Sequence, residues 1–177
     1  MKKTMANKPT IYWDSCVLIA LLKDENRPNG EMRGVYSWAR KVSDGEAVLV
    51  LSSLARVEIL KSFLRTDQER KFEDFLNRSN IMEIEMGPRV AEKARELRDH
   101  YQGQKQNSKK ILCSEDAIHL ATAIMYRADE FHTFDTNGKN RCLGLIPLSG
   151  SVAGYPLTIC RPQAGGQQEM DLSILEA

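Results

Sequence analysis

The stretch that decides the fold spans residues 10–22 and reads TIYWDSCVLIALL. Its first four residues are β-branched or aromatic, which favours a short strand, and this strand ends at Asp14. The apolar run that follows, residues 17–22, is typical of the buried turns of a helix. The chain therefore begins its folded part with a strand that ends on a carboxylate and leads into a helix.

The alternation of strand and helix continues along the chain. Apolar and β-branched runs favour further strands at residues 47–51, 81–86 and 131–134, with short edge strands at 143–148 and 155–159. Helical spacing of apolar side chains predicts helices at residues 30–43, 54–64, 67–76, 89–101 and 114–125. This order, with few hairpin signals, predicts an α/β three-layer sandwich in which helices flank a mostly parallel central sheet.

The composition is that of an ordinary folded domain. The chain has 177 residues, of which 42% are hydrophobic and 28% charged, so collagen, coiled-coil rods and wholly disordered chains are excluded. Its 25 Lys and Arg against 24 Asp and Glu leave a net charge of +1, so overall charge cannot hold a nucleic acid, and local basic patches or metal ions must do so. We expect one domain over residues 1–162 and a flexible tail at 163–177.

The cysteines and the hydropathy bear on the compartment. Cysteines stand singly at positions 16, 113, 142 and 160 without a C-x-x-C pair, which argues against zinc-ribbon and thioredoxin-type sites. Reduced thiols are the simplest interpretation. No stretch approaches the ~18 uninterrupted apolar residues of a membrane helix. We therefore expect a soluble, cytoplasmic protein with no membrane partner.

Four acidic residues stand in otherwise apolar surroundings. Asp14 and Asp135 end strands, Glu58 lies between two apolar residues, and Asp116 begins the most apolar helix. Each one alone could be a cap or turn residue. Together at strand ends they would repel one another, and a hard divalent cation with oxygen ligands relieves that repulsion. We expect all four to bind such a cation, Mg²⁺ or Mn²⁺.

The segments around these acids resemble the PIN domain, a nuclease family that includes the VapC-type toxins. They read IYWDS (11–15), RVEI (56–59), DAIHLATA (116–123) and TFDTN (133–137), and the resemblance extends from about residue 11 to residue 159. It implies a metal-dependent endoribonuclease that acts on RNA and whose acidic quartet is Asp14, Glu58, Asp116 and Asp135. It also implies a small antitoxin as a partner and a homodimer as a state. Ser15 and Asn137 are possible additional site residues.

Phosphate groups of a substrate need cations besides the metal. Basic residues adjoin each acidic segment, and we expect substrate contacts from Arg56, Lys61, Lys109, Lys110, Lys139 and Arg141. Each of them could equally be an ordinary solvated surface charge. His119 lies one turn after Asp116 among apolar neighbours, so we interpret it as a hydrogen-bonded core histidine outside the site.

Two other functions remain open at this point. A haloacid-dehalogenase-like phosphatase also begins with a strand ending in Asp, but it needs a second Asp two residues later, where this chain has Cys16. A catalytically inactive PIN-like module that binds RNA or protein would keep the same fold. Cleavage of single-stranded RNA that depends on Mg²⁺ or Mn²⁺ would distinguish a nuclease from both.

Overall fold

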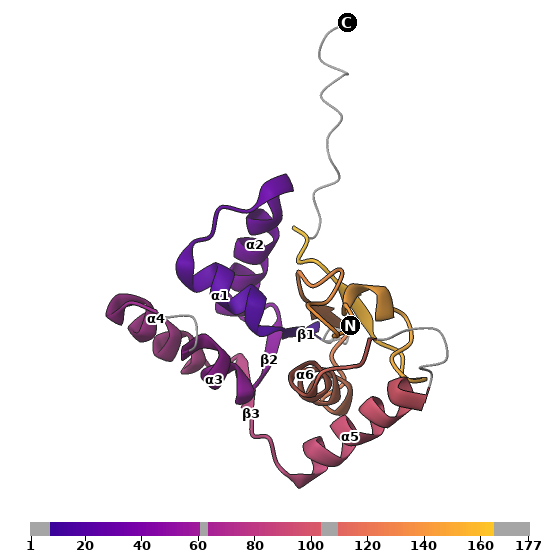
Figure 1. Cartoon of the computed structure of the whole chain (residues 1–177). Helices are drawn as coiled ribbons and strands as arrows, with labels where there is room; N and C mark the ends of the chain where they lie inside the picture. Colours follow the sequence, from indigo (N-terminus) through magenta and orange to yellow (C-terminus); the bar gives the residue numbers. More distant parts are fainter. Residues whose placement is uncertain (1–7, 61–63, 104–109, 165–177) are drawn as a thin grey trace, which may run out of the picture.

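The structure is a computed structural model that describes residues 8–60, 64–103 and 110–164. At its centre is a five-stranded sheet with strand order β3-β2-β1-β4-β5, in which every pair of neighbours is parallel (Figure 1). The strands are β1 (Thr10–Trp13), β2 (Val48–Ser52), β3 (Ile81–Ile84), β4 (Glu130–His132) and β5 (Thr158–Cys160). The predicted α/β sandwich with a parallel sheet is confirmed.

Helices cover both faces of the sheet. One face is covered by α1 (Ser15–Lys23), α2 (Glu31–Ser43), α3 (Leu54–Leu60) and α4 (Thr66–Leu76). The other face carries α5 (Pro88–Gly103) and α6 (Ser114–Met125), which Figure 1 shows on the opposite side of the strands from α1 and α2. Alternation along β1 serves both layers, because Ile11 and Trp13 belong to the first apolar core and Tyr12 to the second. Among the described residues, two short 3₁₀ helices, η1 (Pro28–Gly30) and η3 (Ile146–Leu148), complete the elements.

The strand order places the carboxyl end of β1 at the switch point of the sheet. From β1 the chain moves outward to β2 and β3 on one side, and it returns on the other side as β4 and β5. Beyond the ladder, the Asp14 backbone N–H donates to the carbonyl oxygen of His132 at 3.0 Å, so β1 and β4 end side by side. Crevices at such switch points are where open α/β sheets place ligands.

Two predicted elements differ from the structure. Residues 143–148 are not an edge strand, because Ile146–Leu148 form η3, with Pro147 in its first turn. The Ile146 backbone N–H donates to the Asp135 carbonyl oxygen at 3.0 Å, so this segment closes the loop after β4 instead of extending the sheet. The helix predicted at 54–64 is described only as α3, since residues 61–63 lie outside the described part, as do residues 165–177 of the predicted tail.

The prediction of reduced thiols at every cysteine is also wrong. Cys113 and Cys142 form a disulfide with their Cα atoms 5.5 Å apart, whereas Cys16 and Cys160 are free. Their separation of 29 residues gives no sequence signal. The pair meets because Ile111 and Cys142 form an isolated parallel bridge, which aligns the segment before α6 with the loop after β4.

Across the described segments, every helix is too short or too polar to cross a lipid bilayer.

Replacing Gly34 should test the packing between α2 and the chain after β5. A Cβ atom added at Gly34 would lie 1.9 Å from the Pro162 carbonyl oxygen, a backbone atom that no side-chain rotation can move. We expect Gly34→Ala to lower the free energy of unfolding by about 1–3 kcal/mol in chemical denaturation, despite the better helix propensity of alanine. Gly87→Ala is the control, because a Cβ there meets nothing within 4 Å. Equal stability of the two variants would contradict the close approach.

Candidate active site

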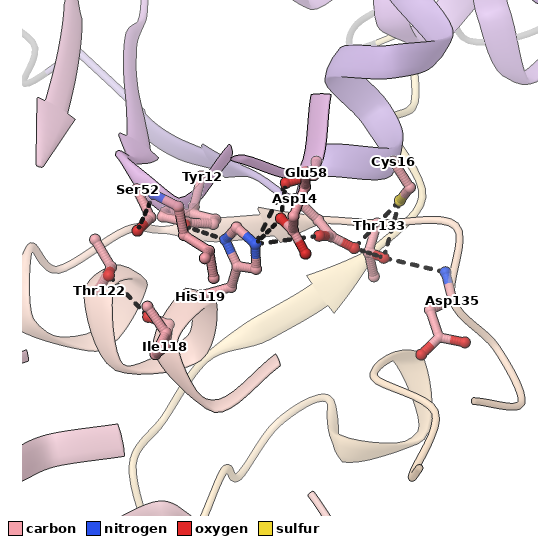
Figure 2. Close-up of polar contacts among 12 residues, drawn as sticks. Tyr12, Asp14, Cys16, Ser52, Glu58, Ile118, His119, Thr122, Thr133 and Asp135 are labelled. Atoms are coloured by element: carbon pink, nitrogen blue, oxygen red, sulfur yellow. Dashed lines mark hydrogen bonds and ion pairs between the residues drawn. The ribbon is translucent and has the colours of Figure 1, made fainter. Parts of the chain in front are cut away.

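Asp14 is held by one side chain at the end of β4 and by another from α1. It directly follows β1 at the N-cap position of α1, but its side chain makes no capping hydrogen bond, so its carboxylate is available for another role. Its Oδ2 accepts hydrogen bonds from the Thr133 hydroxyl at 2.7 Å and from the Cys16 thiol at 3.2 Å (Figure 2). Burial, and then the nearby Asp14 charge, raise the pKa of Cys16 well above its usual value, so this thiol stays protonated and donates.

Glu58 reaches the same place from α3. The Ser15 hydroxyl donates a hydrogen bond to its Oε2, and His119 Nε2 lies 2.8 Å from the same oxygen. Ser52 caps the start of α3, since its Oγ accepts a hydrogen bond from the Leu54 backbone N–H at 3.2 Å. Two donors on one oxygen fix the orientation of the Glu58 carboxylate.

His119 connects the acids to the core of the sheet. Its ring is 1% exposed, and its Nδ1 lies 2.6 Å from the Tyr12 hydroxyl, while Nε2 faces Glu58 and lies 3.9 Å from Asp14 Oδ1. In the neutral ring, Nε2–H donates to Glu58 and Nδ1 accepts from Tyr12. Burial lowers the pKa of His119, but the Glu58 hydrogen bond and the nearby carboxylates raise it by more, so the net shift is upward.

Asp116 and Asp135 complete the acidic group. Burial raises the pKa of Asp116 to about 7, and the charges of Asp14, Asp135 and Glu58 add to that rise while His119 opposes it. The shift of Asp116 therefore reflects burial first and the three neighbouring carboxylates second. Asp135 Oδ1 also accepts from the Gly138 backbone N–H at 2.8 Å, so this carboxylate additionally shapes the loop after β4.

The predicted substrate contacts lie in three different settings. Lys110, Lys139 and Arg141 lie on two segments that are joined by hydrogen bonds, because Lys110 Nζ donates to the Asn137 carbonyl oxygen at 2.6 Å and the Ile111 N–H donates to the Arg141 carbonyl at 2.7 Å. Arg56 instead forms ion pairs with carboxylates. Lys61 and Lys109 lie outside the described residues.

The Arg56 side chain points toward acids of α4 and β3. Its Nη1 lies 2.7 Å from Glu73 and its Nη2 lies 2.9 Å from Glu83. A guanidinium already paired with two carboxylates has less to offer a phosphate, so its role in substrate binding stays a prediction.

Sequence reasoning missed two residues that contact the acids. His119 is a buried, hydrogen-bonded histidine as predicted, but one of its partners is Glu58, which connects it to the site. Thr133 holds Asp14 through its hydroxyl and accepts the Asp135 backbone N–H at 3.0 Å, so it bridges two of the acids. The one available signal was position, because His119 follows Asp116 by one helical turn and Thr133 precedes Asp135 by two residues.

The donor set fits a hard divalent cation. Four carboxylates supply the oxygen ligands that Mg²⁺ and Mn²⁺ prefer, and the charges of Asp14, Asp135 and Glu58 add to the burial that raises the pKa of Asp116. In the described part of the chain, no three of these carboxylates bring oxygens within 4.8 Å of one another. A cation held here by Asp14, Glu58, Asp116 and Asp135 would therefore keep water among its ligands, as Mg²⁺ usually does.

Comparison with known proteins agrees with this arrangement. The family profile described as the PIN domain matches residues 11–141, which include all four acids. The chain belongs to the PIN domain family. A search of curated protein sequences gave no match.

Solved structures share the fold of this PIN domain. One is VapBC2 from Rickettsia felis bound to a DNA fragment from its promoter, with a TM-score of 0.57 and 16% identity over 85% of this chain and 98% of that chain. Another is a toxin–antitoxin complex from Klebsiella pneumoniae, with a TM-score of 0.52 and 20% identity over 86% of this chain and 98% of that chain. At these identities the likeness establishes the fold of the PIN domain alone.

The raised pKa of Asp116 predicts how stability depends on pH without metal. The usual pKa of 3.8 applies to the unfolded chain and about 7 to the native state, so the native state binds more protons between these values. The free energy of unfolding in EDTA should therefore fall as pH rises from about 4 to about 7, and Asp116→Asn should flatten that fall. Chemical denaturation at several pH values measures it. Glu115→Gln, an exposed neighbour in the same helical turn, is the control, and a slope in Asp116→Asn equal to wild type would refute the shift.

Proposed function

We propose that this PIN domain is a metal-dependent endoribonuclease that hydrolyses phosphodiester bonds of RNA with Mg²⁺ or Mn²⁺ as cofactor. The observation that carries the proposal is the convergence of Asp14, Glu58, Asp116 and Asp135 at the switch point of the sheet, with the pKa of Asp116 raised to about 7. Four like charges held together lower the stability of a fold, so stability alone does not explain their placement. Metal binding and phosphate chemistry explain why the acids are placed there.

Side chains of the protein orient two of the four carboxylates. When bound, the cation supplies a hydroxide-like nucleophile and neutralises charge on the scissile phosphate. Thr133 and Cys16 hold Asp14, while Ser15 and His119 hold Glu58, so these carboxylates are oriented before substrate arrives.

Neither nearby nucleophilic side chain suits covalent catalysis. The Ser15 hydroxyl is committed to Glu58, and burial keeps the pKa of Cys16 well above its usual value, so a thiolate is disfavoured. Direct attack by water on the phosphodiester is therefore the favoured route. The position of Cys16 also argues against the phosphatase alternative, which needs an acid at that place.

The substrate phosphates are assigned to the basic cluster of Lys110, Lys139 and Arg141. All three lie on the segments that carry Asp116 and Asp135, and all three are exposed. Cations beside the acidic group can hold the backbone of a single strand while the scissile phosphate enters the site. This placement supports RNA binding by a local patch in a chain of net charge +1.

A small antitoxin is the proposed protein partner. The two solved structures of similar fold are toxin–antitoxin assemblies, which supports a toxin role for this chain. A homodimer remains part of the same proposal. Co-purification of the product of an adjacent gene would identify the antitoxin.

Replacing Asp14 by asparagine tests the activity directly. The amide oxygen still accepts from Thr133 and Cys16, so the fold should persist while the metal loses an anionic ligand. We expect Mg²⁺- or Mn²⁺-dependent cleavage of single-stranded RNA by the purified wild type, abolished by chelator, and a rate at least ~100-fold lower in Asp14→Asn. Glu115→Gln should cleave as wild type does. Cleavage by Asp14→Asn at the wild-type rate would overturn the assignment, and absence of any cleavage by wild type would favour the inactive binding module.

Salt dependence tests the basic cluster. Replacing Lys139 and Arg141 by glutamine should weaken binding of single-stranded RNA and reduce the slope of log affinity against log salt by roughly 1.4, since each phosphate contact contributes about 0.7 for a single strand. Binding is measured by fluorescence anisotropy at several salt concentrations. Arg40 and Arg95, exposed on α2 and α5, provide a charge-matched control pair. An equal reduction of the slope by both double variants would mean that RNA affinity depends on the net charge of the protein and not on this cluster.

A further inference from the structure

A second group of potential metal ligands adjoins the acidic site. Cys113 directly precedes α6, Asp116 lies in the first turn of that helix, and Cys142 lies on the loop after β4. One sulfur from each cysteine and one carboxylate oxygen of Asp116 lie within 4.8 Å of one another, and all three residues are half-buried. The disulfide between Cys113 and Cys142 leaves this group without thiols for as long as it is intact.

The backbone holds the two sulfurs together independently of the disulfide. The Ile111 N–H donates to the Arg141 carbonyl at 2.7 Å, and the Leu143 N–H donates to the Ile111 carbonyl at 2.9 Å, so both cysteines lie next to paired backbone. Cys113 is further fixed by the Ala117 N–H, which donates to its carbonyl at 2.9 Å at the start of α6. Reduction of the disulfide therefore leaves two thiols facing each other and Asp116.

We propose that the reduced protein binds a zinc-class cation through the sulfurs of Cys113 and Cys142 and the carboxylate of Asp116. Tetrahedral zinc with bonds of about 2.3 Å to sulfur and about 2.0–2.2 Å to oxygen needs ligand atoms roughly 3.5–3.8 Å apart, which these side chains reach by small rotations. The half-buried position leaves the fourth ligand position to water. Soft thiolates select zinc over the Mg²⁺ or Mn²⁺ that suits the oxygen-only site.

Reduction of the disulfide comes before metal binding. Two small-molecule thiols reduce the Cys113–Cys142 disulfide, so that the S–S bond breaks, two protein thiols form, and the reductant leaves as its own disulfide. The cation then replaces the two thiol protons, which are released to solvent. Oxidation removes both sulfur ligands and closes the site to the metal.

A second cluster in the described part of the chain does not suit zinc. Glu130, His132 and Cys160 also place donor atoms within 4.8 Å. The Trp13 indole N–H donates to His132 Nδ1 at 3.1 Å, so the neutral ring carries its proton on Nε2, which donates to Glu130 at 2.7 Å. A metal at Nε2 would have to displace that proton or break the buried Trp13 hydrogen bond. This cluster therefore serves as an internal control.

The zinc site would share Asp116 with the proposed nuclease site. If the nuclease assignment holds, zinc on the reduced protein should inhibit cleavage by withdrawing Asp116, and the oxidised protein should resist that inhibition. This consequence depends on the proposed function, whereas metal binding itself does not. Metal binding is therefore measured directly, without an assay of activity.

Cobalt is the probe, because Co²⁺ substitutes for zinc and gives a sulfur-to-metal charge-transfer absorption in the near ultraviolet. A phosphine reduces the disulfide without supplying a competing thiol. Water supplies the oxygen of the phosphine oxide that forms and the two hydrogens of the protein thiols. We expect the band to saturate at one equivalent of Co²⁺ in the reduced full-length protein, to be absent from the oxidised protein, and to disappear when Zn²⁺ is added. Cys113→Ser and Cys142→Ser should each lose it, whereas Cys16→Ser and Cys160→Ser should keep it.

Asp116→Asn should raise the dissociation constant for Co²⁺ at least ~10-fold, while Glu115→Gln should leave it unchanged. Equal metal affinity in Asp116→Asn and wild type would restrict the site to the two sulfurs and overturn the shared-ligand proposal. A band that is missing from the reduced wild type, persists in the oxidised protein, or depends on Cys160 would overturn the site as a whole. Each of these results leaves the nuclease proposal standing, since Asp14→Asn tests that separately.

Discussion

The parallel register of β1 between β2 and β4 is the constraint on which the rest of the molecule depends. It brings the ends of these strands to one edge, where the Asp14 N–H bonds to the His132 carbonyl and Thr133 reaches Asp14. Four carboxylates can gather there only because apolar cores on both faces of the sheet fix the strands against the repulsion. Burial of Asp116, together with the charges of Asp14, Asp135 and Glu58, raises the pKa of this carboxyl, so its ionised form is disfavoured in the native state.

Much of the architecture could be predicted because it rests on local patterns. The run of β-branched and aromatic residues before Asp14 fixes a strand, and the apolar positions of 114–125 fix a helix that is buried on most sides. Once strands and helices alternate, parallel pairing follows, and the ends of parallel strands must meet. Asp14 and Asp135 could thus be placed at one edge from their positions alone, without any knowledge of contacts.

The remaining features depend on contacts between distant residues. The Cys113–Cys142 bond joins segments 29 residues apart through the bridge at Ile111, and no spacing rule encodes such a bridge. His119 looked like an ordinary core residue because its partners, Tyr12 and Glu58, lie far away in sequence. Residues 143–148 are mostly apolar, but Pro147 and the tertiary hydrogen bond of Ile146 to Asp135 favour a 3₁₀ turn over a strand.

The division of the core along the chain has a consequence for synthesis on the ribosome. The first apolar core is built from buried residues between Ile11 and Ile81, so it can consolidate while the second half of the chain is still being made. Its two acids, Asp14 and Glu58, emerge early, but β4 pairs with β1 across more than a hundred residues, and Asp135 follows it. The acidic group that we propose to hold the cation therefore stays incomplete until β4 has docked, because the nascent chain lacks Asp135 up to that point.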